Sequence, residues 1–218
     1  MQSIARESLA ALFEALRDVF AAQREALIAL DGKVGDSDLG ITMNKAFNAA
    51  YETVRLNAAD PIGKTLQLAG MAMAKAAPST MGTLVATGFM RGGKALEGAV
   101  AWGTPEMHAF WNAFLNGVAE RGKAQPGDKT VLDVLGPIAM ALQAAQADGL
   151  ELPQALHKAS QAAAAGLEAT KAMVAQHGKA ACFQEKTIGL QDAGATVGFL
   201  LIDTLHTFAS KSLAPAQP

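Results

Sequence analysis

Hydrophobic residues recur along almost the whole chain at the spacing of an α-helix, and this periodicity restricts the fold more than any other feature. In the first segment, one helical face carries an apolar stripe: Leu9, Leu12, Phe13, Leu16, Val19, Phe20, Leu27 and Leu30. Later stripes with the same spacing lie within residues 104–124, 153–175 and 197–208. Aromatic residues make up only 6% of the chain, whereas alanine is very frequent. The pattern predicts an all-α protein of closely packed helices, with no convincing strand.

Helix start and stop signals divide the chain into eight expected helices. Pro61 and Pro105 each follow a capping residue and mark helix starts, and Pro78 ends the third helix. Because the connections are short, successive helices should run antiparallel, as an up-and-down bundle or barrel. We interpret residues 1–210 as a single domain and residues 211–218 as a flexible tail.

Alternate loops of an up-and-down bundle meet at the same end of the molecule. The loops after the first, third and seventh expected helices are residues 31–40, 76–82 and 177–192. The loop after the fifth helix is either 99–104 or 122–129. These loops are polar and rich in glycine, so we expect the functional site at the end where they gather.

Charge and cysteine content narrow the classes of partner. The net charge is −2, whereas binding of nucleic acid or an anionic membrane would require a basic face. The most apolar stretch, residues 193–205, is shorter than the roughly 20 residues that a membrane-spanning helix needs. The single cysteine, Cys182, excludes an intrachain disulfide and fits a reducing compartment. We therefore expect a cytoplasmic protein that has no signal peptide and that binds neither a membrane nor nucleic acid.

The most informative segment is residues 30–40, where three aspartates lie within eight residues at the end of a helix. The aspartates are Asp31, Asp36 and Asp38, and glycines interleave with them. Like charges this close repel one another unless they are solvated or neutralised. A hard cation such as Mg²⁺ would neutralise them, and glycines let the loop turn tightly enough for the carboxylates to converge.

Three other interpretations of this loop were weighed. A solvated turn that caps the next helix is the commonest explanation of an isolated pair of aspartates. An EF-hand does not fit, because Thr42 stands where the twelfth position requires glutamate. A P-loop does not fit either, because the chain has no GxxxxGK[ST] motif. Since Mg²⁺ in proteins usually completes its octahedron with phosphate oxygens, a phosphate-bearing ligand is the natural partner.

The aspartate loop resembles the metal loop of the dihydroxyacetone kinase subunit L family. The pattern is Leu-Asp-x4-Asp-x-Asp-x-Gly over residues 30–40, followed by Met43, Asn44 and Phe47. Three further segments resemble the same family in the same order, namely residues 81–84, 121–130 and 188–196. The resemblance covers nearly the whole chain.

The resemblance implies an eight-helix barrel with ADP or ATP sealing one end over two Mg²⁺ ions. It assigns the metal to Asp31, Asp36 and Asp38, and catalysis to these three residues together with Lys179. Nucleotide-binding positions carried over from the family are Gly40, Thr42, Ser79, Thr80, Gly82, Gly122, Val131, Lys179, Asp192 and Gly194. The beginning of a helix, where Gly40 and Thr42 fall, favours phosphate through its free N–H groups and dipole. Gly122 and Val131 would line the base and sugar.

Several positions depart from the family pattern. Leu39 stands where histidine is usual, and Thr42 stands where asparagine is usual. The serine- and glycine-rich phosphate loop is shortened to residues 77–80, and Ala193 replaces proline in the last motif. Lys179 stands where arginine is usual and is a less bidentate donor.

The family implies a split phosphotransferase. Its partner subunit, of the K type, binds a small keto-sugar covalently through a histidine of its own. A lone L subunit implies that bound ADP serves as a coenzyme, which a phosphoryl-carrier protein of the sugar phosphotransferase system recharges. The alternative within the class is an ATP-dependent kinase with its halves on two chains. Alternatives from other classes are a non-catalytic regulator and a stand-alone metal-dependent phosphatase. The histidines, including His177 beside the last loop, are interpreted as structural or surface residues.

Overall fold

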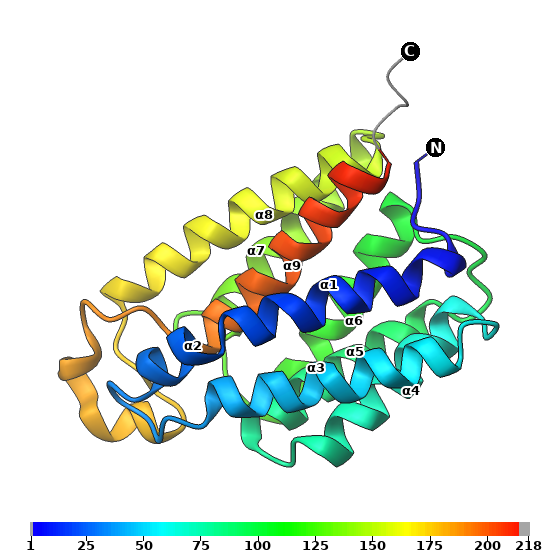
Figure 1. Ribbon diagram of the computed structural model, residues 1–218. Helices are drawn as coiled ribbons and strands as arrows, with labels where there is room; N and C mark the ends of the chain where they lie inside the picture. The colour runs from blue at the N-terminus through cyan, green and yellow to red at the C-terminus, as the bar shows by residue number, and fades with distance from the viewer. Residues whose placement is uncertain (1, 214–218) are drawn as a thin grey trace.

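Antiparallel helices surround a shared apolar core (Figure 1). The structure is a computed structural model, and it describes residues 2–213. The α-helices are α1 (Leu9–Ala22), α2 (Arg24–Asp31), α3 (Leu39–Leu56), α4 (Ile62–Ala76), α5 (Thr80–Ala95), α6 (Thr104–Gly122), α7 (Leu132–Ala147), α8 (Leu152–Ala169) and α9 (Ala193–Ser212). Short 3-10 helices are η1 (Arg6–Ser8), η2 (Thr170–Ala172) and η3 (Lys179–Thr187). Among the described residues, β-structure is limited to one bridge between Ile4 and Trp102. The all-α prediction is confirmed.

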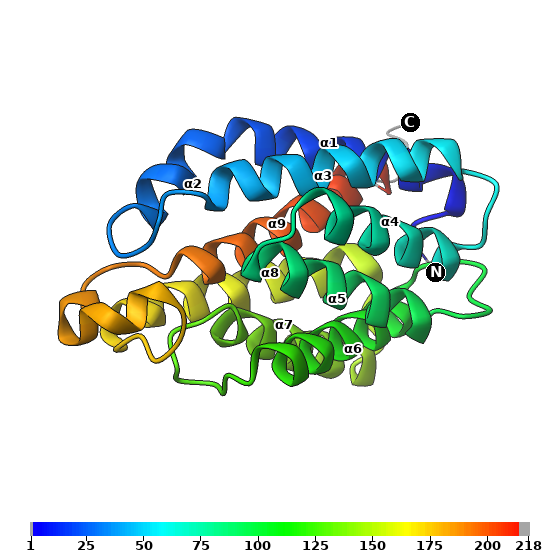
Figure 2. The same cartoon turned by 90° about the horizontal axis from the view of Figure 1, so that it is seen from below.

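The helices form a closed ring. α3 to α8 each pack against the next helix along the chain, and α1 packs against both α3 and α9. Figures 1 and 2 show the long helices running roughly parallel to one another around a common axis. Each amphipathic helix thus buries its apolar stripe between two neighbours, and the predicted up-and-down barrel is confirmed.

The segment predicted as one helix up to Leu30 is divided at Gln23. The backbone of Gln23 has φ −86° and ψ 1°, although hydrogen bonds from the Gln23 amide to Val19 and from Leu27 to Gln23 continue across it. Beyond the break, α2 lies directly against the start of α3. A Cβ atom at Gly40 would stand 2.0 Å from the carbonyl oxygen of Arg24. This close approach brings the end of α2 near the beginning of α3.

The few aromatic residues fill the interior of the barrel. Phe20 and Phe47 stack with ring centroids 4.2 Å apart. Phe89 makes edge contacts with Phe110 and Phe114 at 5.7 and 5.6 Å. Such geometries add a favourable quadrupole term to the burial of apolar area. The core is therefore solid, and the residues that recognise a ligand must lie at an end or on the surface.

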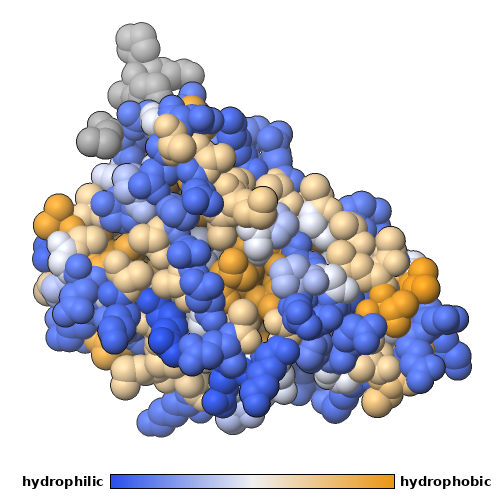
Figure 3. Space-filling model, turned by 180° about the vertical axis from the view of Figure 1, so that it is seen from behind, coloured by the Kyte–Doolittle hydropathy of each residue, from blue (hydrophilic) through white to orange (hydrophobic). Residues whose placement is uncertain are grey.

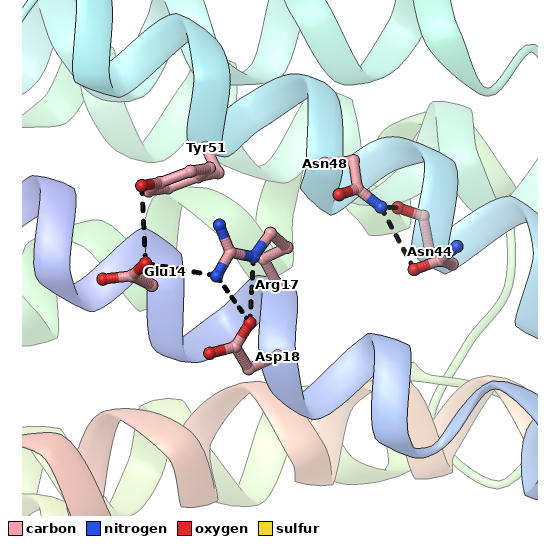
Figure 4. A network of polar contacts seen from close by, with 6 residues as sticks. All are labelled: Glu14, Arg17, Asp18, Asn44, Asn48 and Tyr51. Atoms are coloured by element: carbon pink, nitrogen blue, oxygen red, sulfur yellow. Dashed lines mark hydrogen bonds and ion pairs between the residues drawn. The ribbon is translucent and has the colours of Figure 1, made fainter.

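A polar network joins α1 to α3 on the outside of the barrel (Figure 4). The Arg17 guanidinium donates to Asp18 at 2.7 Å and to Glu14 at 3.2 Å, and lies 4.2 Å from the centroid of the Tyr51 ring. The Tyr51 hydroxyl donates to Glu14 at 3.4 Å. Because these groups are solvent-accessible, the network contributes modestly to holding the two helices together.

The loops separate into two groups at opposite ends. The α2–α3, α6–α7 and α8–α9 loops lie together at one end, whereas both marked termini lie at the other (Figures 1 and 2). Residues 99–104, one of two options for the loop after the fifth predicted helix, lie at the far end, where Trp102 pairs with Ile4. That option is wrong, because this loop follows α5, which is the fourth helix of the ring when α1 and α2 are counted as one.

The outer surface and the end of the chain complete the description. The face opposite to that of Figure 1 is mixed, with hydrophilic side chains interspersed among moderately hydrophobic ones and small groups of strongly hydrophobic ones (Figure 3). No helix among residues 2–213 is both long and apolar enough to cross a membrane. α9 extends to Ser212, so the first residues of the predicted tail are helical, and residues 214–218 lie outside the described part.

Candidate functional site

Four loops from one end of the barrel line a single cleft of about 240 Å³. They connect α2 to α3, α4 to α5, α6 to α7 and α8 to α9. These are the four predicted loop regions, with residues 122–129 as the correct choice for the third. The alternation that the sequence predicts therefore brings distant segments to one place.

The cleft contains the three crowded aspartates. One carboxylate oxygen from each of Asp31, Asp36 and Asp38 lies within 4.8 Å of the others. Asp31 is half-buried, while Asp36 and Asp38 are exposed. Burial raises the pKa of Asp38 above its ordinary value, and the charges of Asp36 and Asp31 raise it further. The cluster thus carries more negative charge than its surroundings neutralise, which favours a divalent cation.

The backbone between the aspartates forces them to converge. One carboxylate oxygen of Asp31 accepts hydrogen bonds from the amides of Asp38 at 3.0 Å and Leu39 at 3.4 Å. Ser37 adopts a left-handed conformation with φ 61°. Gly35 lies so close that a Cβ atom there would stand 2.2 Å from the other Asp31 oxygen. Glycine is therefore required at position 35 for the loop to fold onto Asp31.

Lys179 reaches the cluster from η3. Its ammonium forms an ion pair with the Asp36 carboxylate. This hydrogen bond lowers the pKa of Asp36 and raises the pKa of Lys179. Both side chains are exposed, so solvent screens the pair and its contribution to stability is small. The ion pair matters for where it places the charge, because it brings a cation from η3 to the carboxylates of the α2–α3 loop.

Three helices point their N-termini at the cleft, which is lined by residues of the first turns of α3, α5 and α9. Ser79 caps α5 by accepting from the Gly82 amide at 3.1 Å. Asp192 caps α9 by accepting from the Ala195 amide at 2.7 Å, and burial raises the pKa of Asp192 to about 6. Helix N-termini carry partial positive charge and favour anions such as phosphate. The cleft thus combines a cation site with an anion-favouring wall.

The residues that the sequence assigns to the site fall into three groups. Eight line the cleft: Asp31, Asp36, Asp38, Ser79, Thr80, Lys179, Asp192 and Gly194. Gly122 lines an adjoining groove that also includes Ser79 and Thr80. The other four are buried and line neither hollow: Gly40, Thr42, Gly82 and Val131. The amides of Thr42 and Gly82 already donate to groups at the starts of their own helices.

Three polar residues of the cleft were not assigned from the sequence. Lys129, His177 and Gln191 line it together with the predicted residues. The Nε2 atom of His177 lies 2.9 Å from an Asp128 carboxylate oxygen, so this histidine joins two of the loops. Lys129 is almost fully buried. Lys129 stands in residues 121–130, one of the segments that resemble the family, but a loop lysine is ordinarily solvated.

Comparison with known proteins identifies the family. Residues 33–207 match the DAK2 domain. The chain belongs to the DAK2 domain family. The predicted resemblance to dihydroxyacetone kinase subunit L is confirmed by a protein of Escherichia coli K12, the ADP-binding subunit DhaL of PEP-dependent dihydroxyacetone kinase. It is 33% identical over 194 residues, which cover 89% of this chain and 92% of that protein.

Two other relatives are longer kinases. The L-erythrulose kinase of Pectobacterium atrosepticum is 30% identical over 210 residues, which span 92% of this chain but 34% of that enzyme. The dihydroxyacetone kinase of C. freundii superposes with a TM-score of 0.71 and 25% identity, over 95% of this chain and 35% of that one. A second structure of that kinase is a complex with AMP-PNP and Mg²⁺. The chain is therefore a member of a family of phosphotransferases.

Proposed function

We propose that this DAK2 chain is the nucleotide-binding subunit of a dihydroxyacetone-type kinase, which passes a phosphoryl group from bound ADP or ATP to a small keto-sugar held by a partner subunit. The observation that carries the proposal is the convergence of Asp31, Asp36 and Asp38 opposite Lys179, at a wall of helix N-termini. A cation site beside an anion site is what a metal–phosphate ligand requires.

The carboxylates fit magnesium. Their oxygens are hard ligands within 4.8 Å of one another, and Asp36 and Asp38 are open to solvent. Asp31, Asp36 and Asp38 would hold the metal, and three carboxylates offer enough oxygens for two ions that also bind phosphate. Bound magnesium would neutralise charge on the phosphates during transfer.

The opposite wall suits the phosphates. Ser79 and Thr80 bring hydroxyl groups and the start of α5 to the cleft. Lys179 is paired with Asp36. The Lys179 ammonium thus lies beside the carboxylates that would hold the metal, where it would stabilise the transferring group. The adjoining groove at Gly122 would take the base and sugar.

The keto-sugar would be held by a partner of the K type. His177, the histidine of this cleft, is engaged with Asp128, and no general base faces the aspartates among the residues that line it. Such a cleft can position and neutralise a phosphoryl group but does not activate a sugar hydroxyl. A partner that supplies the acceptor in activated form completes the reaction.

The E. coli relative is named as the ADP-binding subunit of a PEP-dependent kinase, which favours ADP as a bound coenzyme over ATP as a substrate. In this form, a phosphoryl-carrier protein would recharge the nucleotide. Exchange of labelled ADP distinguishes the two forms. Retention over many turnovers supports the coenzyme, whereas rapid exchange with free ATP supports the ATP-dependent kinase.

Isothermal titration calorimetry on the purified protein tests the proposal. We expect Mg²⁺ and ADP to bind cooperatively, and Asp36→Ala to abolish the Mg²⁺-dependent part of ADP binding. Glu106→Gln, at the opposite end of the barrel, is the matched control. The absence of both Mg²⁺ and nucleotide binding to the wild-type protein would contradict the proposal.

A further inference from the structure

The segment that carries Lys179 has little hydrophobic anchoring. Among residues 170–190, only Thr170, Ala175 and Thr187 are buried. The large apolar side chains of Phe183 and Ile188 are instead 41% and 51% exposed. Since burial of apolar area normally fixes a loop of this length, a different interaction must hold this one against the barrel.

That interaction is centred on Lys129. Its ammonium lies 2.8 Å from the carbonyl oxygen of Thr170 and 3.2 Å from that of Met173, at the beginning of the segment. It also lies 2.7 Å from the carbonyl oxygens of Thr187 and Leu190, at the end of the segment. One cation therefore joins the two sides of the loop at its neck.

Lysine is chemically suited to this position. An ammonium group has three N–H donors and no acceptor, so converging carbonyl oxygens are its natural partners. Lys129 is 4% exposed, and burial lowers its pKa, while the nearby Asp192 carboxyl opposes that effect. Because its donors are directed at carbonyls, Lys129 does not need to contact a ligand in order to affect the cleft.

The backbone that presents Lys129 is itself held in place. Lys129 has a left-handed conformation with φ 58°. The buried Asp133 carboxylate accepts from the amides of Gly127 at 2.5 Å and Thr130 at 2.7 Å, on either side of the lysine. A further hydrogen bond runs from the Gln176 amide to the Asp128 carbonyl at 3.0 Å. The α6–α7 loop thus forms a rigid base for the segment.

We propose that Lys129 is a positioning residue, a latch that closes the neck of residues 170–190 and thereby holds Lys179 over the aspartate cluster. This role rests on the proposed function insofar as Lys179 acts on a phosphoryl group. The closure of the loop itself does not depend on any reaction.

Hydrogen exchange on the whole protein tests the closure. The amides of Ala175 and Gly189 are bonded across the neck, at 3.0 Å to the Thr187 hydroxyl and 2.7 Å to the Lys171 carbonyl. In Lys129→Met we expect these amides to exchange roughly 10- to 100-fold faster, because buried carbonyls lose their partner. Lys171→Met, which removes an exposed lysine of the same neck, is the matched control and should leave their exchange unchanged.

Two results of this measurement would overturn the latch. One is unchanged exchange at Ala175 and Gly189 in Lys129→Met. The other is loss of protection in helices α1 to α9 as well, which would make Lys129 a general stabiliser of the barrel. Retained protection in the helices, with rapid exchange confined to residues 172–190, is the supporting result.

Phosphoryl transfer in the complex with the keto-sugar subunit tests the action through Lys179. We expect Lys129→Met and Lys179→Ala each to lower kcat, and the double variant to be no slower than Lys179→Ala alone. Losses that multiply would show that Lys129 does not act through Lys179. If the wild-type protein bound no Mg²⁺ and ADP, the proposed function would fail, while the exchange measurement would still decide on the closure.

Discussion

The two ends of the barrel are constructed alike but differ in chemistry. The far end has a hollow of about 320 Å³, compared with about 240 Å³ for the cleft. Both carboxylates of that hollow are engaged by backbone amides. Glu106 accepts from Gly103 at 3.0 Å, and Glu151 accepts from Gln2 at 2.6 Å. The acidic groups of this hollow are therefore used for capping α6 and for holding Gln2.

Helix N-termini do not account for the difference, since α4, α6 and α8 begin at the far end and α3, α5 and α9 begin at the cleft. What distinguishes the cleft is the crowding of Asp31, Asp36 and Asp38 opposite the exposed ammonium of Lys179. The volume of a hollow and the helix dipoles around it are therefore insufficient to make a metal–phosphate site. Carboxylates that crowd together without backbone partners for most of their oxygens are the decisive feature.

The largest expected effect comes from removing one of these carboxylates. Asp36→Ala should lower phosphoryl transfer by about 1000-fold, because the metal loses a ligand that the rest of the loop cannot replace. Steady-state kinetics of the complex with the keto-sugar subunit measures the loss. Glu106→Gln at the far end should stay within about twofold of the wild-type rate. Equal losses of phosphoryl-transfer rate in the two variants would show that the two ends of the barrel do not differ in function.

The second effect concerns pH and Asp192, the half-buried cap of α9 at the cleft. The pKa of Asp192 is raised to about 6 from 3.8, so the folded protein takes up a proton at a higher pH than the unfolded chain does. Between these values the free energy of unfolding should fall as pH rises, by about 3 kcal/mol in total from this group. Asp192→Asn keeps a capping side chain and stays neutral. Urea denaturation from pH 4 to 7 should therefore show a flatter profile for Asp192→Asn, and parallel profiles would contradict the assignment.

The sequence predicts the helices and the aspartate loop well because both depend on local patterns. The apolar stripes specify which face of each helix is buried, and the loop alternation brings residues 31–40 and 177–192 to one end. Asp31, Asp36 and Asp38 lie within eight residues, so a tight loop suffices to bring them together. The break at Gln23 was missed, since it depends on how closely α3 approaches α2 at Gly40.

The residues that hold the loops of the site in place could not be predicted in the same way. Lys129 is buried by carbonyls that lie 41 to 61 residues further along the chain. No local sequence pattern predicts such contacts, and a loop lysine is ordinarily solvated. Only the family resemblance predicted that Lys179 lies at the site, because its partner Asp36 lies 143 residues away in the sequence. Long-range polar contacts between loops are thus what the structure adds.

The third prediction tests whether the cation of the cleft matters as much as its carboxylates. Lys179→Ala should lower kcat by about 50-fold and change ADP affinity less, because the ammonium acts mainly on charge that develops during transfer. Lys179→Arg should restore most of the rate, since arginine keeps the charge and adds a bidentate donor. Single-turnover kinetics at saturating nucleotide measures the effect. A loss confined to KM would assign Lys179 to ground-state binding instead.

The smallest effect concerns the loop backbone, for which the barrel offers a matched pair of glycines. Gly35→Ala places a methyl group 2.2 Å from an Asp31 carboxylate oxygen and 2.7 Å from its carbonyl oxygen, so the loop must open and the aspartates must separate. We expect Mg²⁺ affinity to fall about tenfold, which corresponds to roughly 1.4 kcal/mol. Gly136→Ala, inside α7 with no atom within 4 Å of the new methyl group, should leave Mg²⁺ affinity unchanged and stabilise the fold by about 0.5–1 kcal/mol. Calorimetry and thermal unfolding on both variants would separate the site from the scaffold. Equal Mg²⁺ affinities would mean that the carboxylates converge without help from the glycine, and that their crowding alone distinguishes this end of the barrel.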